Sequence, residues 1–403
     1  MAGLPPLHGV RVVDISQIGA GPYATSWLGD FGADVVKVEP LAGDPLRYLD
    51  DAFEVGTSAY FASLNRSKRA IAVDLKTPEG RQVLDKLLDG ADVFVASMRP
   101  AALARLGLDY ESLAPRFPAL VHCTLTAFGE SGPLSPYPGI DGLAQALGGI
   151  MGTTGEPGRT PIKTGPAIAD FVGAFHLCLA VVLALRAKDR DGQGQRVSVN
   201  LLDGQVSMMP NLTTTFQQAV KRGLPGFELE GGAHAHVVPY QAFLASDDWF
   251  VVACSTQRFW VNFCTAIGRT DLLDDERFAT NELRVQNRSL LVPGLERLML
   301  ERPRAEWVAL FRGADVPCAP VNRVQDVMND LQILHNQMLL ELEHPRLGTI
   351  RTVANPLKLH STPTRSYGYP PDLGEHTRDV LKELGYGEED VVALLNAGVI
   401  RTA

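Results

Sequence analysis

Residues 10–22 read Val10-Arg11-Val12-Val13-Asp14-Ile15-Ser16-Gln17-Ile18-Gly19-Ala20-Gly21-Pro22, and this stretch decides the fold. Its apolar start is typical of a buried strand, because a strand covered on both faces shows little polar alternation. Gly19 and Gly21 allow a tight turn, and Pro22 suits the first position of a helix, where a missing N–H costs little. We therefore expect a strand, a turn and a helix that runs to about Gly29.

The same alternation of strand and helix continues through the first part of the chain. Further strands are expected at 34–38, 69–75, 93–95 and 120–125. A helix is expected to follow the strand at 69–75, opened by Thr77 and Pro78. Strands separated by helices predict an α/β fold, with a parallel sheet covered by helices on both faces.

The length of 403 residues exceeds the usual size of a single core, so we expect more than one domain. Residues 1–210 are assigned to a large domain, 211–236 to a linker, and 237–322 to a small α+β domain. The remaining segment, 323–403, is assigned to a further linker and a C-terminal part of the large domain. Residues 132–165 are rich in Gly and Pro and lack periodicity, which predicts a long functional or interface-forming loop.

Composition excludes several classes of partner. Hydrophobic residues make up 45% and charged residues 21%, as in ordinary globular proteins, and a net charge of -9 without a basic run argues against nucleic acid. The longest apolar run, Leu177 to Leu185, is short for a membrane span, and Met1 to His8 lacks signal-peptide features. The five cysteines are scattered, and His234 and His236 have no partners at metal-binding spacing, so we expect a reduced, cytoplasmic protein without a metal.

One carboxylate stands alone among small and apolar residues. The segment Lys163-Thr164-Gly165-Pro166-Ala167-Ile168-Ala169-Asp170 continues as Phe171-Val172-Gly173-Ala174-Phe175, and no Lys or Arg follows before Arg186. Apolar surroundings disfavour the charged form of a carboxylate and make it a better nucleophile or base. The alternative is that Asp170 caps a helix from Phe171 to about Arg186. Both interpretations stay open at this point.

A second pattern resembles a dinucleotide-binding turn. Gly19-Ala20-Gly21-Pro22-Tyr23-Ala24 fits G-x-G-x-x-A between a strand and a helix, and Glu39 stands where an acidic residue would hold a ribose. Against this, Pro22 removes an N–H that a pyrophosphate would need, and Pro40 directly follows Glu39. A glycine turn that serves chain geometry alone is the alternative.

Several segments match one family in the same order along the chain. They are Asp14–Pro22, Gly32–Pro40, Asn65-Arg66-Ser67-Lys68-Arg69 with Val73-Asp74-Leu75-Lys76, Phe128-Gly129-Glu130-Ser131-Gly132-Pro133, Gly165–Asp170, and Leu373-Gly374-Glu375-His376-Thr377. With these motifs the whole chain resembles the family III CoA-transferases, which include formyl-CoA transferase and carnitine CoA-transferase and are related to α-methylacyl-CoA racemase. The resemblance implies a Rossmann-like large domain, completed by the C-terminal segment, with a small domain inserted. It also implies an interlocked homodimer.

The resemblance assigns Asp170 as the catalytic residue of a CoA-transferase. The substrates implied are an acyl-CoA thioester and a free carboxylic acid, with no permanently bound cofactor. The carboxylate attacks the thioester to form a mixed anhydride, and the released thiolate then forms an aspartyl-CoA thioester. An acceptor acid reverses the sequence, and water has to be excluded because it would hydrolyse each intermediate.

The family's substrate contacts fall on two sets of residues. The CoA-contacting positions correspond to Gln17, Ile18, Pro40, Val73, Lys76, Ser97, Met98 and Arg105. Among these, Lys76 and Arg105 would balance the CoA phosphates, Gln17 would lie near the thioester, and Ser97 stands where many members carry Asn. The substrate pocket corresponds to Gly19, Tyr60 and Ile140.

A related activity, racemisation of an acyl-CoA, is the main alternative. Racemases that resemble this family pair the aspartate with the histidine of a Gly-His-Asp motif to move a proton at the α-carbon. Here the matching segment reads Gly139-Ile140-Asp141, and isoleucine cannot take a proton. Transferases often carry tyrosine at this position, so Ile140 leaves the lining of the acyl pocket, and hence the acids transferred, unassigned. A dinucleotide-dependent oxidoreductase is the alternative from another class.

Overall fold

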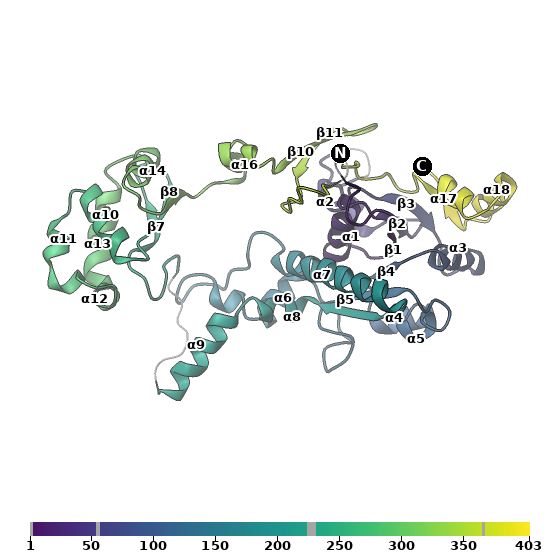
Figure 1. The fold of residues 1–403 in the computed structure, drawn as a ribbon, viewed down its shortest axis with the longest axis horizontal. Helices are drawn as coiled ribbons and strands as arrows, with labels where there is room; N and C mark the ends of the chain where they lie inside the picture. The colour runs from purple at the N-terminus through teal and green to yellow at the C-terminus, as the bar shows by residue number, and fades with distance from the viewer. Residues whose placement is uncertain (1–2, 54–56, 224–230, 365–366) are drawn as a thin grey trace. The chain divides into compact units, whose positions relative to one another are not determined.

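The computed structural model describes residues 3–53, 57–223, 231–364 and 367–403. The chain divides into two compact units (Figure 1). Unit 1 comprises Met1–Ile150, Lys163–Thr214 and Leu334–Ala403, and unit 2 comprises Met151–Ile162 and Thr215–Ile333. The larger unit therefore contains both Asp170 and the C-terminal segment.

Unit 1 is built on a seven-stranded sheet in the order β12-β3-β2-β1-β4-β5-β6. The strands are β1 Arg11–Asp14, β2 Asp34–Glu39, β3 Arg69–Val73, β4 Val93–Ala96, β5 Val121–Thr126, β6 Arg196–Asn200 and β12 Ile400–Arg401. Only the last of these runs antiparallel, paired with β3 through Ile400 and Val73. The C-terminal segment thus adds a strand to a sheet that is otherwise parallel, and the expected α/β class is confirmed.

Neighbouring residues of the central strand enter two different cores. Val12 belongs to a cluster with Trp27 and Leu177, whereas Val13 belongs to a cluster with Val83 and Leu381. Because successive side chains of a strand point to opposite faces, helices cover both faces of the sheet, as expected. The first cluster lies under α1 (Ala20–Asp30) and α7 (Ile168–Asp191), and the second under α3 (Pro78–Asp89), α4 (Pro100–Arg105), α5 (Tyr110–Leu113), α17 (Thr377–Glu383) and α18 (Glu388–Asn396).

The strand order places a topological switch point between β1 and β4. The chain passes from β1 to β2 and β3 on one side, then returns to β4 on the other side of β1. At such a switch point the connections that leave β1 and β4 diverge, and ligands of open α/β sheets bind outside the carboxyl ends of these strands. The carboxyl end of β1 leads into Ser16–Gly19, and that of β4 leads into Ser97 and Met98.

The other elements of unit 1 lie around this sheet. They are α2 (Ala59–Leu64), α6 (Asp141–Leu147), α8 (Leu201–Ser207), the short 3-10 helix η1 (Pro45–Tyr48), and the antiparallel hairpin of β10 (Leu339–His344) and β11 (Gly348–Val353). Thr77 caps α3 as expected, because its hydroxyl accepts a hydrogen bond from the Gly80 N–H at 3.1 Å.

Unit 2 holds a three-stranded antiparallel sheet and several short helices around an aromatic core. Its strands are β7 (Tyr240–Leu244), β8 (Trp249–Ala253) and β9 (Cys318–Pro320). Trp260, Phe263, Trp307 and Phe311 stack in its interior. Its helices include α10 (Gln257–Ala266), α11 (Asp271–Asp274), η3 (Glu276–Phe278), α12 (Asn281–Gln286), α13 (Arg288–Met299), α14 (Arg304–Gly313) and α15 (Val324–Val327), followed by α16 (Leu331–His335) where the two units meet along the chain.

Two segments are more regular than the sequence predicts. The 132–165 stretch, expected to be a loop, contains α6 and the 3-10 turn η2 (Met151–Thr153). The expected linker at 211–236 begins inside α9 (Pro210–Lys221), and its residues 224–230 lie outside the described residues. Both helices were missed because they bury few side chains: α9 has no buried residue at all.

The helix α7 extends well beyond the apolar run Leu177 to Leu185, which alone is short for a membrane span. It has 24 residues and, by length and composition alone, it is apolar enough to cross a membrane. One side of it packs on α1, α8 and β5 inside unit 1. The other side exposes Phe175, Leu179, Val182 and Leu183. The helix is therefore a core element with one uncovered apolar face.

Candidate functional site

Asp170 lies in the first turn of α7, not in front of it. The helix begins at Ile168, and its N-cap position is Ala167, which has no side-chain acceptor. The expectation that Asp170 caps a helix beginning at Phe171 is therefore wrong, because the helix starts three residues earlier than that. The Asp170 side chain is left for another role.

The Asp170 carboxylate touches the turn that follows β1. A Cβ placed on Gly19 would lie 2.3 Å from Asp170 Oδ2 and 2.9 Å from its Cγ. Atoms never approach so closely, so position 19 accepts only glycine while Asp170 keeps this place. Gly19 therefore lets the backbone at the carboxyl end of β1 come into contact with the carboxylate.

The surroundings of Asp170 favour its neutral form. Among the described residues, no group donates a hydrogen bond to the carboxylate and no cation faces it. Burial, and then the negative charge of Asp141, raise the pKa of Asp170 to about 7 from its ordinary value of 3.8. A carboxylate of this pKa is more basic than an exposed one and is still half ionised near neutrality.

A short polar chain supports the start of α7. Asp141 Oδ1 accepts the backbone N–H of Ala169 at 2.8 Å and lies 3.4 Å from the Asp170 nitrogen. Asp141 Oδ2 accepts a hydrogen bond from Gln145 Nε2 at 2.7 Å. Gln145 Oε1 in turn accepts the Thr164 N–H at 3.0 Å. These contacts join α6, the segment before Asp170 and the first turn of α7.

The turn after β1 is held in an unusual conformation. Ile18 has φ of +69°, in the left-handed region that a branched residue rarely adopts. Both carboxylate oxygens of Asp44 lie 3.2 Å from the Ile18 nitrogen, and the Gln17 N–H donates to Ser97 Oγ at 2.9 Å. Side chains from two distant segments, Asp44 after β2 and Ser97 after β4, thus hold the backbone of this turn.

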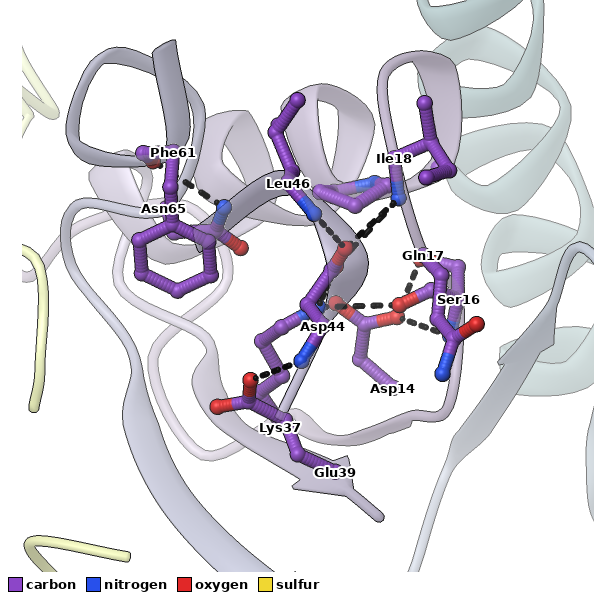
Figure 2. Close-up of polar contacts among 12 residues, drawn as sticks. Asp14, Ser16, Gln17, Ile18, Lys37, Glu39, Asp44, Leu46, Phe61 and Asn65 are labelled. Carbon is purple, nitrogen blue, oxygen red and sulfur yellow. Dashed lines mark hydrogen bonds and ion pairs between the residues drawn. The ribbon is translucent and has the colours of Figure 1, made fainter. Parts of the chain in front are cut away.

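Buried charges anchor the same turn from within the sheet. Figure 2 shows Asp14, Lys37 and Asp44 beside Ser16 and Ile18. Lys37 Nζ donates to the Ser16 carbonyl at 2.9 Å and to Asp44 at 3.0 Å. Burial opposes the charge of Lys37, but Asp44 and Asp14 outweigh it and raise the Lys37 pKa. Lys37 thus joins the Ser16 carbonyl to the Asp44 carboxylate, and buried hydrogen-bonded networks of this kind favour one conformation of the turn.

Most of the positions matched to CoA contacts lie at or just after the carboxyl ends of the strands of the large sheet. Gln17 and Ile18 follow β1, Pro40 follows β2, Lys76 follows β3, and Ser97 and Met98 follow β4, while Val73 ends β3 and Arg105 ends α4. Pro40, Lys76 and Arg105 are exposed, and Gln17, Ser97 and Met98 are partly exposed. Val73 is 1% exposed and pairs with Ile400 of β12, so almost none of its surface faces solvent.

The other two pocket positions, Tyr60 and Ile140, lie in different surroundings. Tyr60, on α2, has its pKa raised by burial and then by the charges of Asp170 and Asp141, so it lies within electrostatic reach of both. Ile140 precedes α6 as its N-cap residue and is 67% exposed. An exposed isoleucine supplies no proton-transfer group beside Asp170.

The dinucleotide interpretation of the glycine turn loses its two main supports. Glu39 is buried and binds Arg47 through two hydrogen bonds of 2.8 and 2.7 Å, so it is not available to a ribose. A Cβ on Gly21 would lie 2.4 Å from the Ser16 Cβ, and Gly19 is needed for Asp170. Packing and the carboxylate therefore explain both glycines.

The roles of three residues of the site were not predicted from the sequence. Asp44 and Lys37 act on Ile18 and Ser16 from distant positions, and no local pattern reveals such contacts. Asp141 was read only as part of the Gly139-Ile140-Asp141 segment, although an acidic residue at the start of a helix is a recognisable signal. In the described part of the chain, no group of three or more His, Cys, Asp or Glu side chains is arranged to hold a metal ion.

Comparison with known proteins adds an independent result. The sequence model described as "CoA-transferase family III" matches residues 7–377. The chain is 37% identical to the mouse succinyl-CoA:glutarate CoA-transferase over 98% of this chain and 91% of that protein. It is 34% identical to the succinate--glutarate CoA-transferase of Agrobacterium fabrum over 94% of this chain and 96% of that protein. A crystal structure of a CAIB/BAIF family protein from Brucella suis superposes with a TM-score of 0.85 at 34% identity, covering 95% of this chain and 100% of that one.

Proposed function

The chain belongs to the CoA-transferase family III, and we propose that it moves CoA from an acyl-CoA thioester to a carboxylic acid with Asp170 as the nucleophile. The observation that carries this proposal is the placement of Asp170. No described residue donates a hydrogen bond to its carboxylate or brings a cation to it, its pKa is raised to about 7, and it contacts the Gly19 backbone at the switch point of the sheet.

The proposed reaction begins with attack of the Asp170 carboxylate on the thioester carbon. A C–O bond forms, the C–S bond breaks, and CoA leaves as a thiolate, which gives a mixed anhydride. The thiolate then attacks the Asp170 carbonyl carbon and expels the donor acid, which keeps the oxygen that bridged the anhydride. Asp170 now carries CoA as a thioester.

The acceptor acid completes the cycle by the reverse steps. Its carboxylate attacks the aspartyl-CoA thioester, and the thiolate is released again. Attack of the thiolate on the acceptor's acyl carbon yields the new acyl-CoA and restores the Asp170 carboxylate. One oxygen of that carboxylate now comes from the acceptor. An acceptor labelled with ¹⁸O would therefore transfer the label to Asp170.

Residues around Asp170 are assigned roles in binding. Lys76, shortly after the carboxyl end of β3, and Arg105, at the end of α4, are exposed cations that would pair with CoA phosphates. Gln17 would lie beside the thioester, because its N–H is fixed on Ser97 next to the turn that touches Asp170. The glycine turn and the buried Lys37–Asp44 pair keep this arrangement rigid before substrate binds.

For the acids, we propose short dicarboxylates. Relatives that match over nearly their whole length are named for succinyl-CoA with glutarate, with mesaconate and with D-citramalate. Succinyl-CoA is therefore the donor to test first. Since Ile140 is exposed and apolar, we do not assign it a contact with the distal carboxylate.

The purified protein is expected to transfer CoA from succinyl-CoA to glutarate or another free acid. A panel of acids is incubated with succinyl-CoA, and the new acyl-CoA is separated and quantified. Transfer to none of the acids from any of several CoA donors would contradict the proposed function. Solvent deuterium at the α-carbon of a chiral acyl-CoA would instead show a racemase, and saturable NAD binding would favour an oxidoreductase.

We also propose that a second copy of this chain covers the apolar face of α7. Phe175, Leu179 and Val182 line a groove of about 690 Å³ together with Trp27. Leu183 beside them is 61% exposed. A continuous apolar surface of this kind in a protein otherwise charged and globular marks an interface. The resemblance to an interlocked homodimer supports the same occupant, and the cytoplasm stays the expected location.

The mass in solution tests this interface. Sedimentation is expected to give twice 43.6 kDa. The double variant Leu179→Asp/Leu183→Asp is expected to dissociate or aggregate, because two charges enter the apolar contact. Val392→Asp, at an exposed apolar position on α18, serves as the matched control and should leave the mass unchanged. A monomeric wild-type protein at micromolar concentration would overturn this part of the proposal.

A further inference from the structure

The helix that carries the nucleophile lacks a cap of its own. Its N-cap residue is Ala167, so no side chain from the same segment accepts the first free N–H groups of α7. Asp141, which opens α6, supplies the missing acceptor to Ala169 at 2.8 Å and lies 3.4 Å from the Asp170 nitrogen. The start of α7 is thus fixed by a residue 29 positions away from Asp170.

Asp141 is itself held in place. Its second oxygen accepts the Gln145 amide at 2.7 Å, and Gln145 is fully buried. The other end of Gln145 accepts the backbone N–H of Thr164 at 3.0 Å and its hydroxyl at 3.3 Å. The segment before the nucleophile and the nucleophile itself are therefore tied to the same two side chains.

Asp141 also acts on Asp170 through its charge. A helix N-terminus carries a partial positive charge, which favours an ionised carboxylate in the first turn. Asp141 works against this effect, and with burial it keeps the pKa of Asp170 high. Among the described residues, the titratable groups that interact with Asp170 from the packed elements are Asp141 on α6 and Tyr60 on α2. Tyr60 is neutral over the working range of pH because its own pKa is raised.

We propose that Asp141 is a positioning residue for CoA transfer, which holds the first turn of α7 through its backbone N–H groups and places a second carboxylate beside Asp170. This inference rests on the proposed function of Asp170. A second carboxylate beside Asp170 raises the free energy of its ionised form and so makes it more basic. The more basic carboxylate is the better nucleophile. Gln145 supports Asp141 without adding charge.

Two variants separate the charge of Asp141 from its support. Asp141→Asn keeps an oxygen for the Ala169 N–H and removes the charge. Gln145→Met keeps the size of the side chain and the Asp141 charge but removes the bonds to Asp141 and Thr164. The control is Asp390→Asn, because Asp390 accepts the Gly387 N–H at 2.9 Å at the start of another helix of unit 1, α18.

The pH profile of kcat/KM with succinyl-CoA reports on both variants. Asp141→Asn is expected to move the acidic limb to lower pH by about one unit, since a like charge next to Asp170 is lost. Gln145→Met is expected to lower kcat roughly tenfold, leaving the limb and the KM for succinyl-CoA in place. Asp390→Asn is expected to match the wild type in all three quantities.

A titration without turnover makes the test independent of the proposed function. The carboxyl carbon of Asp170 is followed by ¹³C NMR against pH and assigned by its absence from Asp170→Asn. A midpoint that falls in Asp141→Asn and is unchanged in Asp390→Asn supports the inference. An unchanged midpoint in Asp141→Asn, or an equal shift in Asp390→Asn, overturns it. Absence of CoA transfer by the wild type would refute the proposed function instead, and the NMR result would still decide the role of Asp141.

Discussion

Asp170→Asn is expected to abolish CoA transfer, with a loss of about 10⁴-fold or more in kcat, as when the nucleophile of a covalent enzyme is removed. An amide has nearly the shape of the carboxylate, but it can form neither the anhydride nor the thioester. The measurement is exchange of labelled succinate into succinyl-CoA, which requires only the first half of the reaction. Exchange at an appreciable fraction of the wild-type rate would show that another group attacks the thioester.

The thermal stability of Asp170→Asn shows whether the variant is folded and whether Asp170 is protonated near neutral pH in the wild type. The pKa of Asp170 is about 7 in the folded chain and near 3.8 when exposed, so the folded state binds more protons between these values. The contribution of Asp170 to stability therefore falls as the pH rises through this window. Asp170→Asn removes that loss, so it should unfold at a higher temperature than the wild type at pH 8 and at a similar one near pH 4. A partly exposed group limits the gain to about 1–2 kcal/mol.

Gly19→Ala is expected to have the largest effect on the rate after loss of the nucleophile itself. The added Cβ would lie 2.3 Å from Asp170 Oδ2, so either the carboxylate or the turn after β1 has to move. A displacement of about 1 Å at a reacting group costs roughly 10²-fold in rate. We expect kcat to fall by about 10²- to 10³-fold, measured with succinyl-CoA and the best acceptor. The unfolding temperature of Gly19→Ala should stay close to that of the wild type, although its kcat falls.

A matched glycine elsewhere shows whether the effect is local. Gly294 lies inside α13 of unit 2, and a Cβ there would meet nothing within 4 Å. Gly294→Ala is expected to keep full activity and to stabilise its helix slightly, because alanine is the better helix former. A Gly19→Ala protein that transfers CoA at the rate of Gly294→Ala would contradict the contact between Gly19 and Asp170.

Local patterns were sufficient to predict most of the large sheet. The apolar run at Val12 and Val13 predicted a strand buried on both faces, and Thr77 followed by Pro78 predicted the start of α3. The order of the strands was not derivable from these patterns, because it depends on where each helix crosses. The family resemblance implied only that the C-terminal segment completes the large domain, and the structure shows this contribution as the two-residue strand β12 beside β3.

The sequence was misleading where a distant residue completes a local structure. Gly165 and Pro166 made a later start of α7 reasonable, and Asp170 looked like its cap. The helix starts earlier because Asp141 supplies an acceptor from another helix, and no window around Asp170 contains that information. The same holds for Ile18, whose left-handed backbone is held by Asp44. Its CoA contact, like those of Lys76 and Arg105, stays a prediction.

The fate of an oxygen atom tests the central claim most directly. The acceptor acid is labelled with ¹⁸O in its carboxylates and incubated with succinyl-CoA and the enzyme for many turnovers, and the protein is then digested with trypsin. Cleavage after Lys163 and Arg186 yields residues 164–186, in which Asp170 is the sole acidic side chain. If Asp170 carries the anhydride and the thioester, the mass of this peptide rises by the label, and no rise occurs without succinyl-CoA. Transfer of CoA that leaves this peptide unlabelled would contradict the account.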